Sequence, residues 1–233
     1  MVEKIHESLM EDSGYLIEVA FVVIHNDAGS MTPVQYIEWL RNRDKALGIA
    51  HYYCSRESIV RVVNTNHIAY HTGDWWSNIR SIGYEVCESM KVSDEEFLEN
   101  KDMALMQATE DLLFYGLPIT TETVRLHHEF VPTSCPHRSL ALHGGTTESV
   151  KEYFVTRMND FSKLGMTVEE MLSNKTTYTI EETNQITEEK TDEELAEEVI
   201  IGLWGNGEER KQHLEEKGYS YENIQKIVNE KLL

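Results

Sequence analysis

The sequence predicts an α/β protein with a mixed central β-sheet flanked by helices, followed by a small C-terminal three-helix bundle. Short β-branched apolar segments alternate with longer segments of helical periodicity over residues 1–172. After that point the composition shifts to Thr, Glu and Asn, and a compact helical pattern then begins. We therefore expect a domain large enough to be catalytic over 1–172, a linker over 173–190 and a helical module over 191–233.

The expected strands are short and rich in β-branched residues. I-E-V-A-F-V-V-I-H, residues 17–25, predicts a buried strand that ends at His25. Residues 49–55 and 58–64 predict a strand pair joined by R-E. S-I-G-Y-E-V-C, residues 81–87, predicts a further strand after a polar, aromatic loop.

Helices are expected between and after these strands. A Thr cap followed by Pro predicts a helix over residues 32–43. A Ser cap, early acids and a glycine near the end predict a long helix over 93–116, and a third helix is expected over about 147–164. In 191–233 three helical patterns are separated at W-G-N-G and K-G-Y-S, and so small a module needs tight packing or self-association.

Composition excludes several classes of partner. The formal charge of −20 argues against nucleic acid and against adsorption to anionic lipid. No apolar run approaches the ~20 residues of a membrane-spanning helix, so membrane insertion is not expected. The N-terminal segment mixes acids into the apolar residues and shows no secretory signal, and three widely spaced cysteines fit a reducing cytoplasm better than a disulfide framework.

Histidine and cysteine are concentrated in R-L-H-H-E-F-V-P-T-S-C-P-H-R, residues 125–138. His127 and Cys135 are eight residues apart, and His25 ends the first expected strand. A strand-end ligand with two ligands from a separate loop is a common design for a three-ligand catalytic metal site, and imidazole with thiolate favours Zn²⁺. The alternative is that the histidines are surface residues and the cysteine is a small packed side chain.

V-V-I-H-N, S-I-G-Y-E-V and R-L-H-H-E-F-V-P-T-S-C-P, in this order and spacing, resemble the type 2 N-acetylmuramoyl-L-alanine amidases, which include phage lysozyme-amidases and animal peptidoglycan recognition proteins. The resemblance covers about residues 18–164. It implies a mixed sheet flanked by helices, with zinc in a groove that takes a peptidoglycan stem. By position it implies zinc ligation by His25, His127 and Cys135, with His128 pointing away.

The resemblance also suggests catalytic groups. Glu85 lies where many bacterial and phage members place a glutamate that moves protons near the metal; the alternative is a strand glutamate that faces solvent. Some members have a tyrosine before the second-strand histidine, but here Ala50 precedes His51. Some have a lysine two residues before the cysteine, where this chain has Thr133. Its hydroxyl either donates to the oxyanion or only caps the turn.

Other side chains are candidates for substrate contact. His51 and His137 either contact the substrate or the metal ligands, or are structural. The loop H-T-G-D-W-W-S-N, residues 71–78, is expected to form a groove wall in which Trp75 and Trp76 stack on sugar or stem peptide. The alternative for these tryptophans is a small hydrophobic cluster.

The C-terminal module is similar to the three-helix repeat at the C-termini of some phage lysozymes, through E-V-I-x-G-x-W-G-N-G-x-x-R. That resemblance implies cell-wall binding by a single copy over residues 191–233. Trp204 and Arg210 are the candidate ligand contacts, and a structural role for Trp204 is the alternative. Self-association through this module would raise the effective concentration of the enzyme at the wall.

Together these features predict a zinc-dependent endolysin, a phage or prophage enzyme that cuts the amide between N-acetylmuramic acid and L-alanine in the peptidoglycan of a Gram-positive host. We expect storage in the host cytoplasm and release to the cell wall at lysis. Two other functions are open: a peptidoglycan-binding protein without activity, and a metallopeptidase that cuts within the stem peptide.

Overall fold

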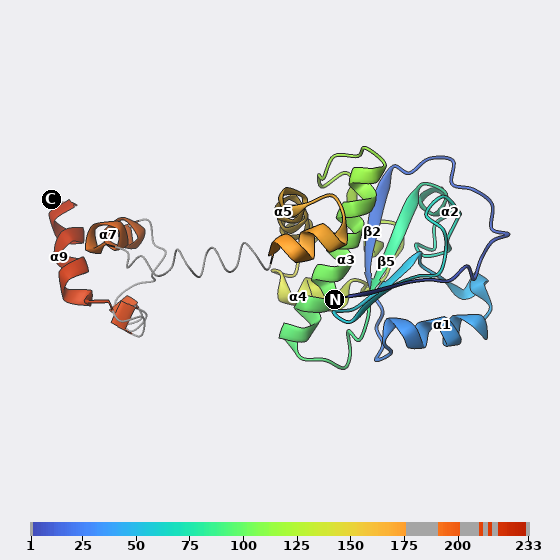
Figure 1. Cartoon of the computed structure of the whole chain (residues 1–233), viewed down its shortest axis with the longest axis horizontal. Helices are drawn as coiled ribbons and strands as arrows, with labels where there is room; N and C mark the ends of the chain where they lie inside the picture. The colour runs from blue at the N-terminus through green and yellow to red at the C-terminus, as the bar shows by residue number, and fades with distance from the viewer. Residues whose placement is uncertain (1, 176–190, 201–209, 212–213, 216–218, 232–233) are drawn as a thin grey trace. The chain divides into compact units, whose positions relative to one another are not determined.

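A six-stranded mixed sheet forms the centre of the first of two units in this computed structural model (Figure 1). The structure describes residues 2–175, 191–200, 210–211, 214–215 and 219–231. The chain divides into Met1–Thr176 and Thr177–Leu233. The expected linker over 173–190 lies mostly outside the described residues. A helix over 168–175 extends beyond residue 172, where the composition predicted the end of the first domain.

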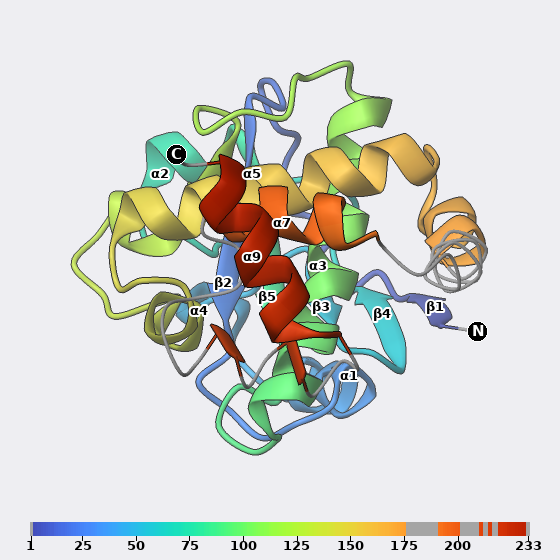
Figure 2. The same cartoon turned by 90° about the vertical axis from the view of Figure 1, so that its left-hand side faces the viewer.

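The strand order is β1-β4-β3-β5-β2-β6, and every neighbouring pair is parallel except β3 with β4. Figure 2 labels β1 to β5 of this sheet. The prediction of a mixed sheet is therefore confirmed. Neither edge strand, β1 nor β6, was anticipated, and the first long apolar segment becomes a strand only from Phe21 onward. The strands are β1 (Glu3–His6), β2 (Phe21–Asn26), β3 (Tyr52–Cys54), β4 (Ser58–Arg61), β5 (Ser81–Val86) and β6 (Val124–Leu126).

Two long helices, α3 (Asp94–Phe114) and α5 (Thr147–Leu164), cover one face of the sheet, as Figure 1 shows. They pack on alternate apolar residues of the central strands, among them Val22, Ile82 and Tyr84. Side chains alternate between faces along a strand, so the residues between these apolar positions point to the other face. This places His25 and Glu85 on the face opposite the long helices.

The opposite face is only half covered. Helix α1 (Pro33–Arg41) packs Tyr36 and Leu40 against β3 and β4. Its start follows the predicted chemistry: the Thr32 hydroxyl accepts from the Gln35 N–H at 3.4 Å, and the Gln35 side chain accepts from the Thr32 N–H at 2.9 Å. Because α1 lies over β3 and β4, the surface over β2 and β5 stays open for a groove.

Short helical segments join the main elements. They are η1 (Lys45–Leu47), α2 (Trp75–Asn78), η2 (His127–Glu129) and α4 (His137–Leu142). The loop expected over 71–78 therefore ends in one turn of helix, capped by Asp74, whose carboxylate accepts from the Ser77 N–H at 2.8 Å. None of the helices in the described part of the chain has both the length and the apolar character needed to cross a bilayer.

The second unit contains helices α7 (Asp192–Ile200) and α9 (Tyr221–Lys231). They share a small core in which Leu195, Leu214 and Ile224 are fully buried. Helical residues also occur at 210–211 and 214–215, but the rest of that segment lies outside the described residues, so the third helix stays a prediction.

Candidate metal centre and substrate groove

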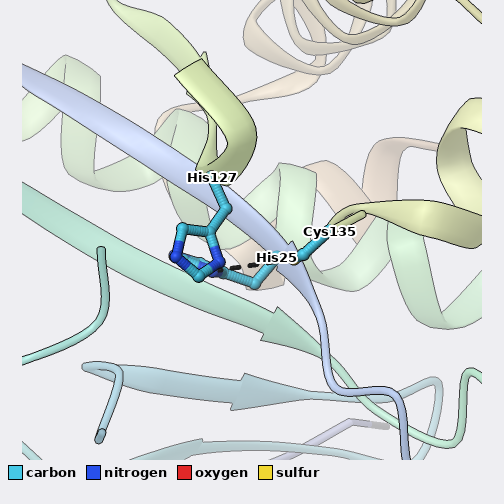
Figure 3. Close-up of side chains that lie close together, drawn as sticks. All are labelled: His25, His127 and Cys135. Atoms are coloured by element: carbon cyan, nitrogen blue, oxygen red, sulfur yellow. Dashed lines mark hydrogen bonds between the residues drawn. The ribbon is translucent and has the colours of Figure 1, made fainter. Parts of the chain in front are cut away.

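Three potential metal ligands from distant parts of the sequence meet at one end of the sheet (Figure 3). His25 lies near the end of β2, His127 begins η2 directly after β6, and Cys135 lies in the loop before α4. One donor atom of each residue lies within 4.8 Å of the other two. Because β2 and β6 are parallel neighbours, their carboxyl ends bring both histidines to the same edge.

Both imidazoles are held by hydrogen bonds at Nε2. His25 Nε2 lies 3.0 Å from Nδ1 of His71, and His127 Nε2 lies 3.2 Å from the carbonyl oxygen of Thr72. The Nδ1 atom of His25 instead faces Cys135, with 3.8 Å to the sulfur. Burial lowers the pKa of His25 and of His127, so both rings are neutral near pH 7 and can offer a lone pair.

Cys135 is held by hydrogen bonds at both its side chain and its backbone. Its sulfur accepts from the backbone N–H of Asn26 at 3.3 Å, and its own N–H donates to the Thr133 hydroxyl at 3.3 Å. Burial, followed by the nearby Glu85 carboxylate, raises the pKa of the Cys135 thiol in the metal-free protein. A divalent cation would reverse this preference because a coordinating thiol gives up its proton.

Glu85 is the carboxylate beside these ligands. It is in register with His25 in the parallel pair of β2 and β5 and therefore points to the same face. Its Oε2 atom is buried and has no hydrogen-bond partner within the described part of the chain. Burial raises the pKa of Glu85 to about 8, with a further contribution from the Asp27 carboxylate. The side chain is thus directed into the protein groove rather than to bulk solvent.

A groove of about 620 Å³ runs from this centre toward α1. His127 and Glu85 line its inner end, and Trp39 and Arg43 line its outer end. The arrangement brings three potential metal ligands, a buried carboxylate and a groove together in one place. A carboxylate of raised pKa beside a metal centre is typical of sites that hydrolyse amide or ester bonds.

The model of the N-acetylmuramoyl-L-alanine amidase family matches residues 16–138, and the model of the CW_7 repeat matches residues 193–232. This chain belongs to the N-acetylmuramoyl-L-alanine amidase family. The predicted family resemblance of the first unit is thereby confirmed, as is the presence of a C-terminal repeat of the cell-wall type.

Phage proteins are among the relatives of this amidase-family chain. It is 43 % identical over 154 residues to Endolysin 2638A of Staphylococcus phage 2638A, and 40 % identical over 151 residues to Endolysin PlyTW of Staphylococcus phage Twort. These matches cover 60 % and 59 % of this chain but only 32 % of each phage protein. The chain therefore spans about a third of the length of these relatives.

Solved structures agree on the fold of the amidase unit. The solution structure of the PlyG catalytic domain matches with a TM-score of 0.58 at 19 % sequence identity. That match covers 68 % of this chain and 94 % of the solved one. At this identity the comparison supports the type 2 amidase fold, a mixed sheet flanked by helices.

The two adjacent tryptophans of this chain have different surroundings. Trp75 lines the groove and is 59 % exposed. Trp76 stacks on Phe21 at a centroid distance of 5.9 Å, and the guanidinium of Arg80 lies 4.9 Å from its ring. Trp76 is itself 53 % exposed, so the two residues differ in their contacts and not in their exposure. The contacts fit substrate stacking at Trp75 and packing on Phe21 at Trp76, where Phe21 in turn stacks on Phe130.

His51 and His137 do not line the amidase groove. His51 is fully buried; its Nδ1 accepts from the Gly83 N–H at 3.0 Å and its Nε2 lies 3.0 Å from the His67 carbonyl oxygen. These bonds fit the structural alternative, and a contact of His51 with substrate stays a prediction. His137 borders a separate hollow beside Ser89, and its buried Nε2 has no hydrogen-bond partner among the described residues.

The remaining predicted residues divide between the two units. His128 Nε2 lies 2.8 Å from the Thr147 hydroxyl of α5, so this ring points away from Cys135. Thr133 is exposed and caps the turn through its bond to the Cys135 N–H. Trp204 lies outside the described residues. Arg210 donates to the Gln225 side chain at 3.1 Å within the C-terminal unit.

Two functional candidates were missed by sequence reasoning. His71, which contacts His25, was read only as part of a groove wall. Asp27, which lies in the turn after β2, accepts from the N–H groups of Glu88 and Ser89 and so holds the end of β5 close to the site. The available signal was that both residues are polar and lie directly after or between expected strands. Their partners, however, are 46 or more positions away in the sequence, so no local pattern identifies them.

Proposed function

We propose that this chain is a zinc-dependent N-acetylmuramoyl-L-alanine amidase that acts as an endolysin on bacterial peptidoglycan. The observation that carries the proposal is the convergence of His25, His127 and Cys135 beside Glu85 at the inner end of an open groove. Family membership and the endolysin relatives support the same activity.

The donor set fits Zn²⁺. Two neutral imidazoles and one thiolate are borderline-soft ligands, and a three-ligand set leaves a fourth position for water. Tetrahedral zinc with typical Zn–N and Zn–S bonds places nitrogen and sulfur about 3.6 Å apart. The 3.8 Å between His25 Nδ1 and Cys135 Sγ is close to that value. Little rearrangement of these two side chains is therefore needed for binding.

Zinc, when bound, would polarise the scissile carbonyl and lower the pKa of water in the site to about 7. In its ionised form, which the positive charge of a bound cation would favour, Glu85 accepts a proton from the attacking water as the water oxygen bonds to the carbonyl carbon. It then delivers that proton to the amide nitrogen, so that the C–N bond breaks and the amine of L-alanine leaves. Its buried Oε2 without a protein partner suits a group that exchanges protons with substrate.

Other residues of the chain bind and orient the substrate. Trp75 stacks on the polymer where it enters the inner groove. The Thr133 hydroxyl donates to the oxyanion formed at the attacked carbonyl, in addition to capping its own turn. Because a hydroxyl carries no charge, its contribution is smaller than that of a lysine at the same position.

The C-terminal unit holds the enzyme to its insoluble substrate. The CW_7 match supports this role, with Trp204 and Arg210 as candidate contacts to the cell wall. A second, tethered binding event raises local enzyme concentration without new contacts at the active site. We also propose that the protein self-associates through this unit, which sedimentation of the full chain tests. Before lysis the protein is stored in the host cytoplasm.

The decisive experiment is product analysis on purified cell walls. The full chain should release soluble fragments with new N-terminal L-alanine, should lose this activity to a chelator and should regain it with added zinc. A new terminus other than L-alanine would identify a peptidase instead, and wall binding without any release would identify a binding protein. Cys135→Ser serves as the matched metal-ligand variant.

A further inference from the structure

His71 links the metal centre to the interior of the protein. The ring is buried, with 7 % of its surface exposed, and lies between two partners. Its Nδ1 is 3.0 Å from His25 Nε2, and its Nε2 is 3.2 Å from the hydroxyl oxygen of Ser81. The Ser81 hydroxyl in turn lies 2.7 Å from the carbonyl oxygen of Ser77.

The last acceptor, the Ser77 carbonyl, sets the direction of each hydrogen bond in the series from His25 through His71 and Ser81 to Ser77. The Ser77 carbonyl has no proton, so the Ser81 hydroxyl donates to it and can only accept from His71. His71 therefore carries its proton on Nε2, and its Nδ1 accepts from Nε2–H of His25. This leaves the lone pair of His25 on Nδ1, the atom that faces Cys135.

The opposite arrangement would disable the ligand. If His71 donated from Nδ1, the proton of His25 would lie on Nδ1 and point toward Cys135, where the metal must bind. The Ser81 hydroxyl would then have to donate both to His71 and to the Ser77 carbonyl, although it has a single proton. The observed partners thus select one tautomer of His25, the one that can coordinate.

The His71 ring is also held in place by its surroundings. A Cβ atom at position 83 would lie 2.5 Å from the His71 Nδ1, so glycine at this point of β5 makes room for the ring. The Asn78 side-chain oxygen accepts from the N–H groups of both His71 and Thr72 at 3.0 Å. The Thr72 carbonyl is the partner of the second histidine ligand, His127. One two-residue segment therefore supports both imidazoles.

We propose that His71 is a positioning residue of the metal centre. It fixes the tautomer and the ring orientation of His25 through its hydrogen bonds to Ser81 and, beyond it, to Ser77. The inference rests on the proposed zinc site. Partners of this kind orient the ligand before the metal arrives, and their loss typically weakens metal affinity 10- to 100-fold.

The test is zinc affinity of the full chain, measured by competition with a chromogenic chelator. His71→Phe keeps a ring of similar size but removes the acceptor, and its dissociation constant should rise about 10- to 100-fold. His71→Asn places an amide oxygen near the former Nδ1 position and should recover most of the affinity. His67→Phe, which replaces a histidine whose ring packs on Tyr15, is the control and should bind zinc as the wild type does.

A purely structural role would give a different result. It would lower the thermal stability of the metal-free protein in both His71 variants and leave the zinc dissociation constant of each folded variant unchanged; that outcome overturns the inference. Ser81→Ala, a small change that removes the acceptor of His71 Nε2 together with the donor to the Ser77 carbonyl, keeps the test open if His71→Phe does not fold. It should weaken zinc binding several-fold, and an unchanged constant contradicts the proposal.

The same data separate this inference from the proposed function. If the wild type binds no zinc at the site, both fail. If the wild type binds zinc tightly and releases L-alanine termini while His71→Phe retains the wild-type dissociation constant, only the role of His71 fails.

Discussion

Glu85 and His25 lie side by side on neighbouring strands, in register and on the same face of the sheet. Their strands are parallel, so the register alone places the carboxylate next to a proposed metal ligand, and no loop is needed to bring them together. Asp27, two residues beyond His25, adds negative charge near the carboxylate and contributes to its raised pKa. This relationship gives two separate predictions for Glu85.

Replacing Glu85 by Gln should abolish proton transfer and leave the metal ligands in place. We expect the rate of L-alanine release to fall about 10²- to 10⁴-fold, the usual contribution of a general acid–base group. Zinc content of the purified variant should match that of the wild type. Glu57→Gln, at an exposed position, is the control. Near-normal activity of Glu85→Gln would remove Glu85 from the mechanism.

The same substitution should stabilise the metal-free protein. The pKa of Glu85 is raised from 4.5 to about 8 in the folded state, so the folded protein binds a proton that the unfolded chain has released. Stability of the wild type therefore falls as pH rises between these values, and Glu85→Gln does not share this loss. In chelator-treated samples the melting temperature of the variant should exceed that of the wild type by a margin that grows from pH 5 to pH 8. A constant margin would contradict the burial of an ionisable group here.

Cys135 should make zinc binding depend on pH. Its thiol has a raised pKa without metal, yet it must lose its proton to coordinate. Zinc affinity should therefore decline as pH falls from 8 to 6, by up to about tenfold per unit for one released proton. Calorimetry in buffers of different ionisation enthalpy counts that proton. Cys135→Ser should lose most zinc and activity, whereas Cys87→Ala, which alters a buried cysteine of the core, should keep the metal.

The adjacent tryptophans should respond differently to truncation. Trp75→Ala removes a groove wall and should raise the KM for a soluble muropeptide roughly tenfold, a loss of about 1.4 kcal/mol of binding, with little change in stability. Trp76→Ala removes the stacking on Phe21 and should lower the free energy of unfolding by about 1 kcal/mol while KM stays near normal. Kinetics and denaturant unfolding of both variants test these two expectations. If Trp75→Ala lowered stability and Trp76→Ala raised KM, the two roles would be exchanged.

Thr133 distinguishes oxyanion stabilisation from turn capping. Thr133→Ser keeps the hydroxyl and should remain active, whereas Thr133→Val should lower kcat by about 10²-fold, the low end for a lost oxyanion donor. Zinc affinity should change little in either variant. If Thr133→Val loses stability but keeps kcat, the hydroxyl serves only to accept the Cys135 N–H.

Local sequence patterns were sufficient for much of the fold. The Thr32 and Ser93 caps with their partner side chains define helix starts within a few residues, and short β-branched segments define the strands of the centre. The edge strand β1 was missed because only one of its four residues, Ile5, is apolar, and because the strand pairs only with β4. Its conformation depends on that distant partner more than on its own composition.

The sequence by itself determined the family, the α/β class, the candidate ligand set and the repeat at the C-terminal end, because motifs, caps and hydrophobic periodicity are all local. Only the tertiary structure decided that Glu85 faces His25, that Trp75 and Trp76 differ, and that His51 is buried. The support of His25 by His71 likewise became visible only there. These relationships depend on sheet register and on side-chain contacts between segments far apart in the chain, which no local pattern encodes.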